Sequence, residues 1–406
     1  MSRYDYARLR PIEVRQTFHQ GRPVFFLRDP LGLSPHYALV PQYLGGLLAA
    51  CDGTKTVLDM QKQFMATTGY FISQHEVEAL LDQLDRIYLL DNDRAAEATA
   101  RALEAYRTAP YRPPALAGLS YPADSASLHH ALQGYVEQTP PAKPLSAGAG
   151  LFSPHIDYFR GGAVYAQAWK RAAQLARDAD LIVLFGTDHN TVSPGQITLT
   201  RQHYATPFGV LPTEQSVVQA VVDVIGEEAA FAEEIHHRKE HSLELVLTWL
   251  HFMREGKPVP VVPILCGPFQ HFIEQGTAPA DDARLNAVIA ALRQATAGRS
   301  VLAVASGDLA HLGPAFHTPP VDAIGKARMQ TDDDRMLAPL AAGDPDAFFE
   351  VIRQERGERN VCGTAPFYLT LKLMGRVQGE VTSYDRCLAD ENQTSFVSVC
   401  GMVFRD

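Results

Sequence analysis

The sequence has few cysteines, and they lack the paired spacing of zinc ribbons and disulfide frameworks. Its 406 residues include five cysteines, and no CxxC pair occurs among them. An odd, widely spaced set does not indicate a small disulfide-stapled fold. The five are Cys51, Cys266, Cys362, Cys387 and Cys400. Cys266 and Cys400 lie in apolar strand patterns, so we expect both to be buried hydrophobic residues.

An excess of positive charge and long apolar runs are also lacking. Lys and Arg number 36 against 46 Asp and Glu, which gives a formal net charge of −10. Because phosphate contacts need a basic surface, this balance argues against a general nucleic-acid-binding protein. No apolar segment approaches the roughly 20 residues of a membrane span, and the start, MSRYDYARLRP, lacks the apolar core of a signal peptide. We therefore expect a soluble cytoplasmic protein with no membrane partner.

Glycine-rich nucleotide loops and a nucleophile elbow are missing as well. The sequence contains no GxGxxG after a strand pattern, no GxxxxGK[ST] loop and no GxSxG. These motifs position dinucleotides, nucleoside triphosphates and catalytic serines, respectively. Their absence argues against Rossmann dehydrogenases, P-loop enzymes and α/β-hydrolases.

The residues that are present predict three segments. Residues 1–95 carry short strands followed by three helices, residues 96–111 form an Ala-rich helical linker, and residues 112–406 form the main domain. In the first segment Ser73 and Glu76 form the S-x-x-E pattern of a helix start. The order FFLRDP, ALV, LLAACDG and that helix resembles PqqD-like, winged-helix-like domains. The resemblance implies peptide binding by strand addition, and a docking or dimerisation module is the alternative.

From residue 147 onward, strand and helix patterns alternate. Continuous apolar runs such as DLIVLFG, VPVVPILCG and SVLAVASGD are typical of strands buried on both faces. Two further strand patterns, GEVTSYDRCL and SFVSVCGMVF, close the chain and are expected to pair antiparallel. The alternation predicts an α/β domain in which helices flank a mixed central sheet.

Histidines follow three of the apolar strands at the point where each strand ends. GLFS leads to His155, DLIVLFG to His189 and SVLAVAS to His311. Each of these histidines has an aspartate one to three positions away; these are Asp157, Asp188 and Asp308. Because the functional crevice of an open α/β sheet lies outside the carboxyl ends of its strands, we expect the three histidines to meet at one edge.

Cys362 stands just before a predicted helix that has Pro366 in its first turn. A helix N-terminus lowers the pKa of a thiol and favours the thiolate, which is a nucleophile and a metal ligand. From these residues alone, two interpretations stay open. Cys362 is either a buried residue of a turn, which is the commoner case, or the third ligand of a His/His/Cys site.

Eight short motifs occur in the order in which the Memo family has them. They are LSYP (119–122), SPHIDY (153–158), GTDH (186–189), TPFGVLPTE (206–214), EHSLE (240–244), PVVPILCG (260–267), SGDLAH (306–311) and CGTAP (362–366). Residues 112–406 thereby resemble this family, which includes the B proteins of AmmeMemoRadiSam systems. The family shares its fold with the LigB-type class III extradiol dioxygenases.

The resemblance implies a metal site made of His155, His189 and Cys362. The dioxygenases hold iron with two histidines and one glutamate, so Cys362 takes the place of the carboxylate. A thiolate beside two imidazoles suits Cu or Zn as well as Fe. We therefore expect a divalent Fe, Cu or Zn ion, and the cysteine argues against catechol dioxygenation.

The same resemblance implies roles for six further residues. His311, oriented by Asp308, is expected to act as general acid or base, because histidine titrates near neutrality. His241 is expected to orient or polarise a substrate. The residues expected around the substrate or beside the ligands are Asp157, Asp188 and Glu244. Asp157 and Asp188 depart from the family pattern, which often has Gly and Ser or Asn at these positions.

Three functions are consistent with these patterns. The first is a metal-dependent oxidoreductase related to the extradiol dioxygenases, in an AmmeMemoRadiSam-type system. The second is a non-catalytic scaffold that binds a peptide or metabolite and partners a radical-SAM or AMMECR-like protein. The third is a zinc peptidase, since residues 237–241 fit H-x-x-E-H. The third is the weakest, because the polar segment AEEIHHRKEHSLE predicts that His236 and His237 lie in a solvated loop.

Overall fold

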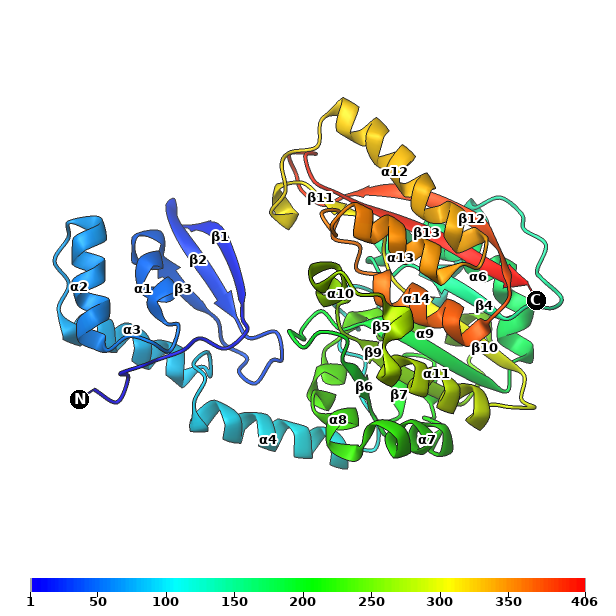
Figure 1. The fold of residues 1–406 in the computed structure, drawn as a ribbon, viewed down its shortest axis with the longest axis horizontal. Coiled ribbons are helices and arrows are strands. Elements are labelled where there is room, and N and C mark those ends of the chain that lie inside the picture. The colour runs from blue at the N-terminus through cyan, green and yellow to red at the C-terminus, as the bar shows by residue number, and fades with distance from the viewer. Residues whose placement is uncertain (1, 406) are drawn as a thin grey trace. The chain divides into compact units, whose positions relative to one another are not determined.

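The structure, a computed structural model, describes residues 2–405 and divides into two compact units, Met1–Thr108 and Ala109–Asp406 (Figure 1). Helix α4 (Asp93–Thr108), which contains most of the predicted linker, belongs to the first unit. Among the described residues, every helix is too short or too polar to span a bilayer.

The first unit combines a three-stranded antiparallel sheet with helices. The strands are β1 (Glu13–His19), β2 (Arg22–Arg28) and β3 (Ala38–Pro41), and the helices before α4 are η1 (Gln42–Leu44), α1 (Gly45–Ala50), α2 (Val57–Thr68) and α3 (Gln74–Arg86). Ser73 and Glu76 form a reciprocal capping box at the start of α3, as the sequence predicted. Strand β1 is an edge strand with six of its seven residues exposed. Peptide addition at such an edge stays a prediction.

The second unit is built on one mixed eight-stranded sheet. Its order is β11-β13-β4-β10-β5-β9-β6, with β12 paired to β13. The strands are β4 (Gly150–Ser153), β5 (Leu181–Thr187), β6 (Ile197–Leu199), β9 (Val261–Cys266), β10 (Val301–Ser306), β11 (His311–Leu312), β12 (Gln378–Leu388) and β13 (Phe396–Arg405), and β7 (Tyr204–Thr206) and β8 (Gly209–Leu211) form a separate hairpin. Strands β4, β10, β5 and β9 run parallel, while β12 and β13 pair antiparallel. The predicted mixed sheet and its closing antiparallel pair are confirmed.

Helices cover both faces of this sheet because its inner strands are apolar on both sides. In β5, Ile182 and Leu184 pack with α5 (Ser125–Gln138), α6 (Tyr158–Asp178) and α9 (His241–Met253). The alternate residues, Leu181, Val183 and Phe185, pack on the other face against α7 (Gln215–Ile225), α11 (Ala283–Ala295) and α14 (Thr364–Met374). The remaining helices are α8 (Glu227–Phe231), η2 (Glu234–Arg238), α10 (Gln270–Gln275), η3 (Pro279–Asp281), η4 (Pro314–Phe316), α12 (Ala323–Ala341) and α13 (Pro345–Gln354).

Candidate metal centre

Three neighbouring parallel strands end at the same edge of the sheet. The register aligns Ser153 of β4 with Ser306 of β10, and Ser306 with Gly186 of β5. His155 and His189 follow these aligned positions by two and three residues, so the chain brings them to one place. The start of α9 supplies a third histidine there.

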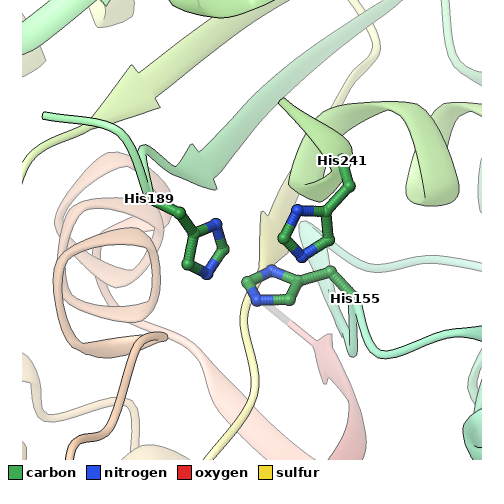
Figure 2. Close-up of side chains that lie close together, drawn as sticks. All are labelled: His155, His189 and His241. Carbon is green, nitrogen blue, oxygen red and sulfur yellow. The ribbon is translucent and has the colours of Figure 1, made fainter. Parts of the chain in front are cut away.

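The imidazoles of His155, His189 and His241 point toward one another (Figure 2). Their ring centroids are 5.0 Å apart for His155 and His189, 5.2 Å for His155 and His241, and 4.6 Å for His189 and His241. One ring nitrogen of each lies within 4.8 Å of the others. The sequence expected His241 to orient a substrate, whereas the structure places it within the histidine cluster.

Cys362 brings a sulfur to the same cluster from the turn before α14. Its Sγ atom lies 3.2 Å from Nε2 of His155 and accepts a hydrogen bond from the backbone N–H of Asp308 at 3.3 Å. The sequence predicted a lowered thiol pKa at this helix start, and that prediction is wrong. Burial raises the pKa of Cys362, although the hydrogen bond with His189 opposes it. A thiolate at this position therefore needs a nearby cation.

Glu240 fixes the orientation of two of the imidazoles. Its Oε1 atom lies 3.0 Å from Nδ1 of His189 and 3.0 Å from Nδ1 of His241. Burial favours the neutral carboxyl, but His189 and His241 hold the pKa of Glu240 well below its usual range. The ionised carboxylate therefore accepts an Nδ1–H from each ring, which leaves both Nε2 atoms to the cluster.

A serine pair fixes the third imidazole. Ser306 donates its hydroxyl proton to the carbonyl of Ser242 at 2.5 Å, so its oxygen accepts Nδ1–H of His155 at 3.3 Å. Burial lowers the pKa of His155 well below its usual value, which keeps the ring neutral. Nε2 of His155 therefore carries a lone pair directed at Cys362. The imidazoles of His155, His189 and His241 form one group of potential ligands, and His155, Asp308 and Cys362 form a second group that shares His155. Imidazole nitrogens beside a sulfur suit a divalent transition-metal ion.

Asp308 orients His155, whereas the sequence predicted that it orients His311. Its Oδ1 atom accepts the backbone N–H of His155 at 2.8 Å, and its Oδ2 atom lies 3.9 Å from Nε2 of that ring. Burial raises the pKa of Asp308 to about 6. Among the described residues it makes no hydrogen bond to His311. The Nδ1 atom of His311 faces the carbonyl of Leu309 at 3.2 Å, and burial lowers the pKa of His311 to about 4.

The predicted substrate-facing acids fall into three different environments. Asp157 caps the start of α6 and pairs with Arg160 at 2.5 Å. Asp188 lies next to His189 but bonds to His236, with 2.8 Å between its Oδ2 atom and Nδ1 of the ring.

Glu244 lies in a buried network, apart from the imidazoles. Its carboxylate accepts hydrogen bonds from Arg112, from Tyr121 and from the backbone N–H groups of Ala115 and Leu116. Arg112 is 0% exposed and Glu244 is 1% exposed. Both carboxylate oxygens are engaged, so Glu244 anchors the start of the second unit to α9.

The H-x-x-E-H segment does not form a zinc-peptidase helix. His237 belongs to η2, whereas His241 begins α9. His237 is 0% exposed, and both ring nitrogens are engaged, Nδ1 with the hydroxyl of Tyr204 at 2.6 Å and Nε2 with the carbonyl of Thr198 at 3.1 Å. His236 is 8% exposed. The predicted solvated loop is therefore wrong for both histidines.

A cavity of about 420 Å³ lies beside the centre. This volume falls within the usual range for small-molecule sites. His189, Asp188 and Cys362 contribute to its wall. Its apolar lining includes Phe269, Ile273, Ile352, Val361 and Ala365.

Sequence reasoning missed Glu240 and Ser306 as residues that orient the imidazoles. Glu240 occurs in two of the sequence motifs, H-x-x-E-H and EHSLE, and neither predicted that it orients the imidazoles. The available signal was the acidic residue directly before His241, because a carboxylate there can cap the helix and accept from the ring. Ser306, inside an apolar strand, gave no signal of its role.

Comparison with known proteins matches the second unit to one family. A family model described as "Memo-like protein" covers residues 112–403. A "MEMO1 family protein" of Aquifex aeolicus is 24% identical over 395 residues, 94% of this chain and 96% of that protein. That span is longer than 112–403, so the likeness extends into the first unit. A "MEMO1 family protein" of Archaeoglobus fulgidus is 26% identical over 299 residues, 72% of this chain and 99% of that protein.

Among solved structures, an uncharacterized protein from Escherichia coli K12 shares 15% sequence identity with a TM-score of 0.37. The match covers 64% of this chain and 100% of that one. The family model spans most of the described chain and includes every residue of the histidine–cysteine cluster. The chain therefore belongs to the family of Memo-like proteins.

Proposed function

We propose that this chain binds a divalent metal ion through His155, His189 and Cys362, with His241 as a fourth donor, and acts as a metal-dependent oxidoreductase. The observation that carries the proposal is the cluster of the three imidazoles, with Sγ of Cys362 3.2 Å from Nε2 of His155, while the Nδ1 atom of each ring is engaged elsewhere. Imidazole and thiolate ligands suit Fe, Cu or Zn, and Fe or Cu would supply electron transfer as well as Lewis acidity.

The residues around the donors hold them in place. Glu240 keeps the Nδ1 protons of His189 and His241, and Ser306 keeps that of His155. The backbone N–H of Asp308 positions the sulfur. Such partners orient ligands and raise their basicity.

The adjoining cavity supplies the place for a substrate. Its volume of about 420 Å³ suits a small molecule, and its wall includes His189 and Cys362. The apolar side chains of Phe269, Ile273 and Ile352 exclude water from a bound molecule. A small organic molecule with an apolar body therefore fits better than a fully charged one.

Metal analysis of the full chain tests the ligand assignment. We expect Cys362→Ala and His189→Ala to lose the ion that the wild type holds in this centre, because each removes a donor. The matched control is Cys387→Ala, which removes a buried thiol that belongs to none of the groups of potential metal ligands among the described residues. Full occupancy in both ligand variants would overturn the assignment.

Turnover tests the oxidoreductase part of the proposal. The wild type is loaded in turn with Fe, Cu and Zn, and O2 consumption and substrate conversion are followed for each. Metal binding without turnover for any of them would instead support the scaffold function. Membership of an AmmeMemoRadiSam-type system is part of the same proposal, and neighbouring radical-SAM and AMMECR-like genes are its test.

A further inference from the structure

A second group of potential metal ligands begins one residue from His189. Asp188, Glu233 and His236 each offer a ligand atom, and these atoms lie within 4.8 Å of one another. Asp188 is 4% exposed and His236 is 8% exposed, so two of the three are shielded from water. None of the three belongs to the centre described above.

The contacts of this group leave one carboxylate oxygen without a partner. Glu233 accepts the hydroxyl of Ser193 on Oε1 at 2.7 Å, whereas its Oε2 atom is buried and has no hydrogen-bond partner among the described residues. Asp188 uses Oδ1 for the backbone N–H groups of Asn190 and Thr191. A buried carboxylate oxygen without a partner is costly, and a cation bound at Oε2 of Glu233 would satisfy it.

The charges point the same way. Two carboxylates face one imidazole, and the buried carboxylate of Glu240 acts on both Asp188 and His236. The group of Asp188, Glu233 and His236 thus combines two carboxylates with one imidazole, which are ligand types that a divalent cation takes.

We propose that Asp188, Glu233 and His236 bind a second divalent cation of the Mn²⁺ or Zn²⁺ type. Carboxylates suit Mn²⁺ and imidazole suits Zn²⁺. The Oδ2 atom of Asp188 and Nδ1 of His236 are 2.8 Å apart. At a metal–ligand distance of about 2.1 Å, two atoms so spaced subtend an angle of roughly 84°, which coordination allows. The cation replaces the proton that the two residues share.

The position of this site gives the cation a structural role that is not part of the proposed function. Asp188 precedes His189 at the end of β5, while Glu233 and His236 lie just before Glu240. A cation bound by all three links the two segments that carry the imidazoles and their orienting carboxylate. It braces the metal centre without contributing a ligand to it.

Counting bound ions in the full chain tests the proposal. The protein is stripped with a chelator, dialysed against Zn²⁺ and measured for metal per chain. We expect two ions in the wild type, one in Glu233→Gln and one in Cys362→Ala. The matched control Glu228→Gln alters an exposed carboxylate on α8 and should keep two. Two ions in Glu233→Gln, or one in the wild type that Cys362→Ala removes, would overturn the second site.

A second variant guards against a loss caused by misfolding. Asp188→Asn keeps an acceptor for the two backbone N–H groups but loses its charge, and it should also bind one ion. Thermal unfolding of the metal-free variants shows that the fold is kept. Cys362→Ala tests the first centre and Glu233→Gln tests the second site, because the two variants remove different ions. If Cys362→Ala kept two ions while Glu233→Gln kept one, only the first centre would be contradicted.

Discussion

A Cβ atom placed on Gly307 would lie 2.5 Å from the Cα atom of Gly363. The backbone that follows β10 and the turn before α14 therefore touch directly. This contact lets the N–H of Gly363 donate to the carbonyl of Asp308 at 3.0 Å and the N–H of Asp308 reach the sulfur of Cys362. The position of the sulfur depends on the absence of a side chain at Gly307.

We expect Gly307→Ala to push the turn with Cys362 away from His155. Overpacking of this kind costs about 1–3 kcal/mol, and the displaced sulfur should weaken metal binding. Denaturant unfolding and metal titration measure the two effects. The control is Gly134→Ala in α5, where an added Cβ meets open space and a helix gains stability. Wild-type affinity in Gly307→Ala would show that the contact does not set the position of the sulfur.

Glu240→Gln should reduce metal affinity while the fold is retained. The amide loses the negative charge and has one acceptor atom, whereas the carboxylate accepts from the two rings on Oε1 and from the backbone N–H of His189 on Oε2. Loss of such an orienting partner typically costs about 10–100-fold in metal affinity. Competition with a chromogenic chelator measures it, with Glu228→Gln as the exposed control. An unchanged affinity would rule out the orienting role.

Glu244→Gln should act on stability and leave the ligands themselves intact. It removes the charge that pairs with the buried Arg112. Breaking a buried pair at one partner costs about 3–5 kcal/mol, because the other charge stays buried. The free energy of unfolding in urea should fall by that order, while the folded protein keeps its metal content. If Glu244 instead served the substrate, unfolding would match the wild type.

His251 should make stability depend on pH. Its Nδ1 atom accepts the hydroxyl of Thr206 at 2.8 Å and its Nε2–H donates to the carbonyl of Gly256 at 3.0 Å, a pattern that needs a neutral ring. Burial lowers the pKa of His251. In the unfolded chain the imidazole takes up a proton near pH 6.5, whereas in the folded chain it stays neutral to a lower pH. The stabilisation from the neutral ring is therefore fully present above about pH 6.5 and is lost as the pH falls toward the folded pKa.

The measurement compares the free energy of unfolding of the wild type and His251→Gln from about pH 7.5 to 5.5. We expect the advantage of the wild type to shrink as the pH falls, since glutamine does not titrate. A difference that stays constant over this range would contradict the assignment of a neutral His251.

The continuous apolar strands were the part of the fold that the sequence revealed best. Residues 181–187 and 301–306 are nearly continuous apolar runs, which is the composition typical of parallel strands buried on both faces. Strand β1, with the sequence EVRQTFH, gave no such signal, because most of its residues are polar and exposed. The histidines at the strand ends followed from the same reasoning, since parallel strands deliver their carboxyl ends to one edge.

The contacts between distant residues were beyond the sequence. Glu240 contacts His189, which is 51 positions earlier in the chain. The polar sequence around Glu240 does not reveal that its side chain is buried. The prediction for His236 and His237 was wrong for the same reason, because a carboxylate, a tyrosine hydroxyl and a backbone carbonyl supply buried partners that the sequence does not reveal. The polar partners that stabilise buried charges come from tertiary structure.

Strand β4, which leads to His155, has β13 on one side, and β13 follows it in the chain by more than 240 residues. During synthesis on the ribosome, β4 therefore emerges long before its neighbour exists. Its backbone groups on that side stay open until residues 396–405 have been made, and an open strand edge can pair with other chains. The strand that leads to His155 therefore gains its neighbour only after residues 396–405 have been made.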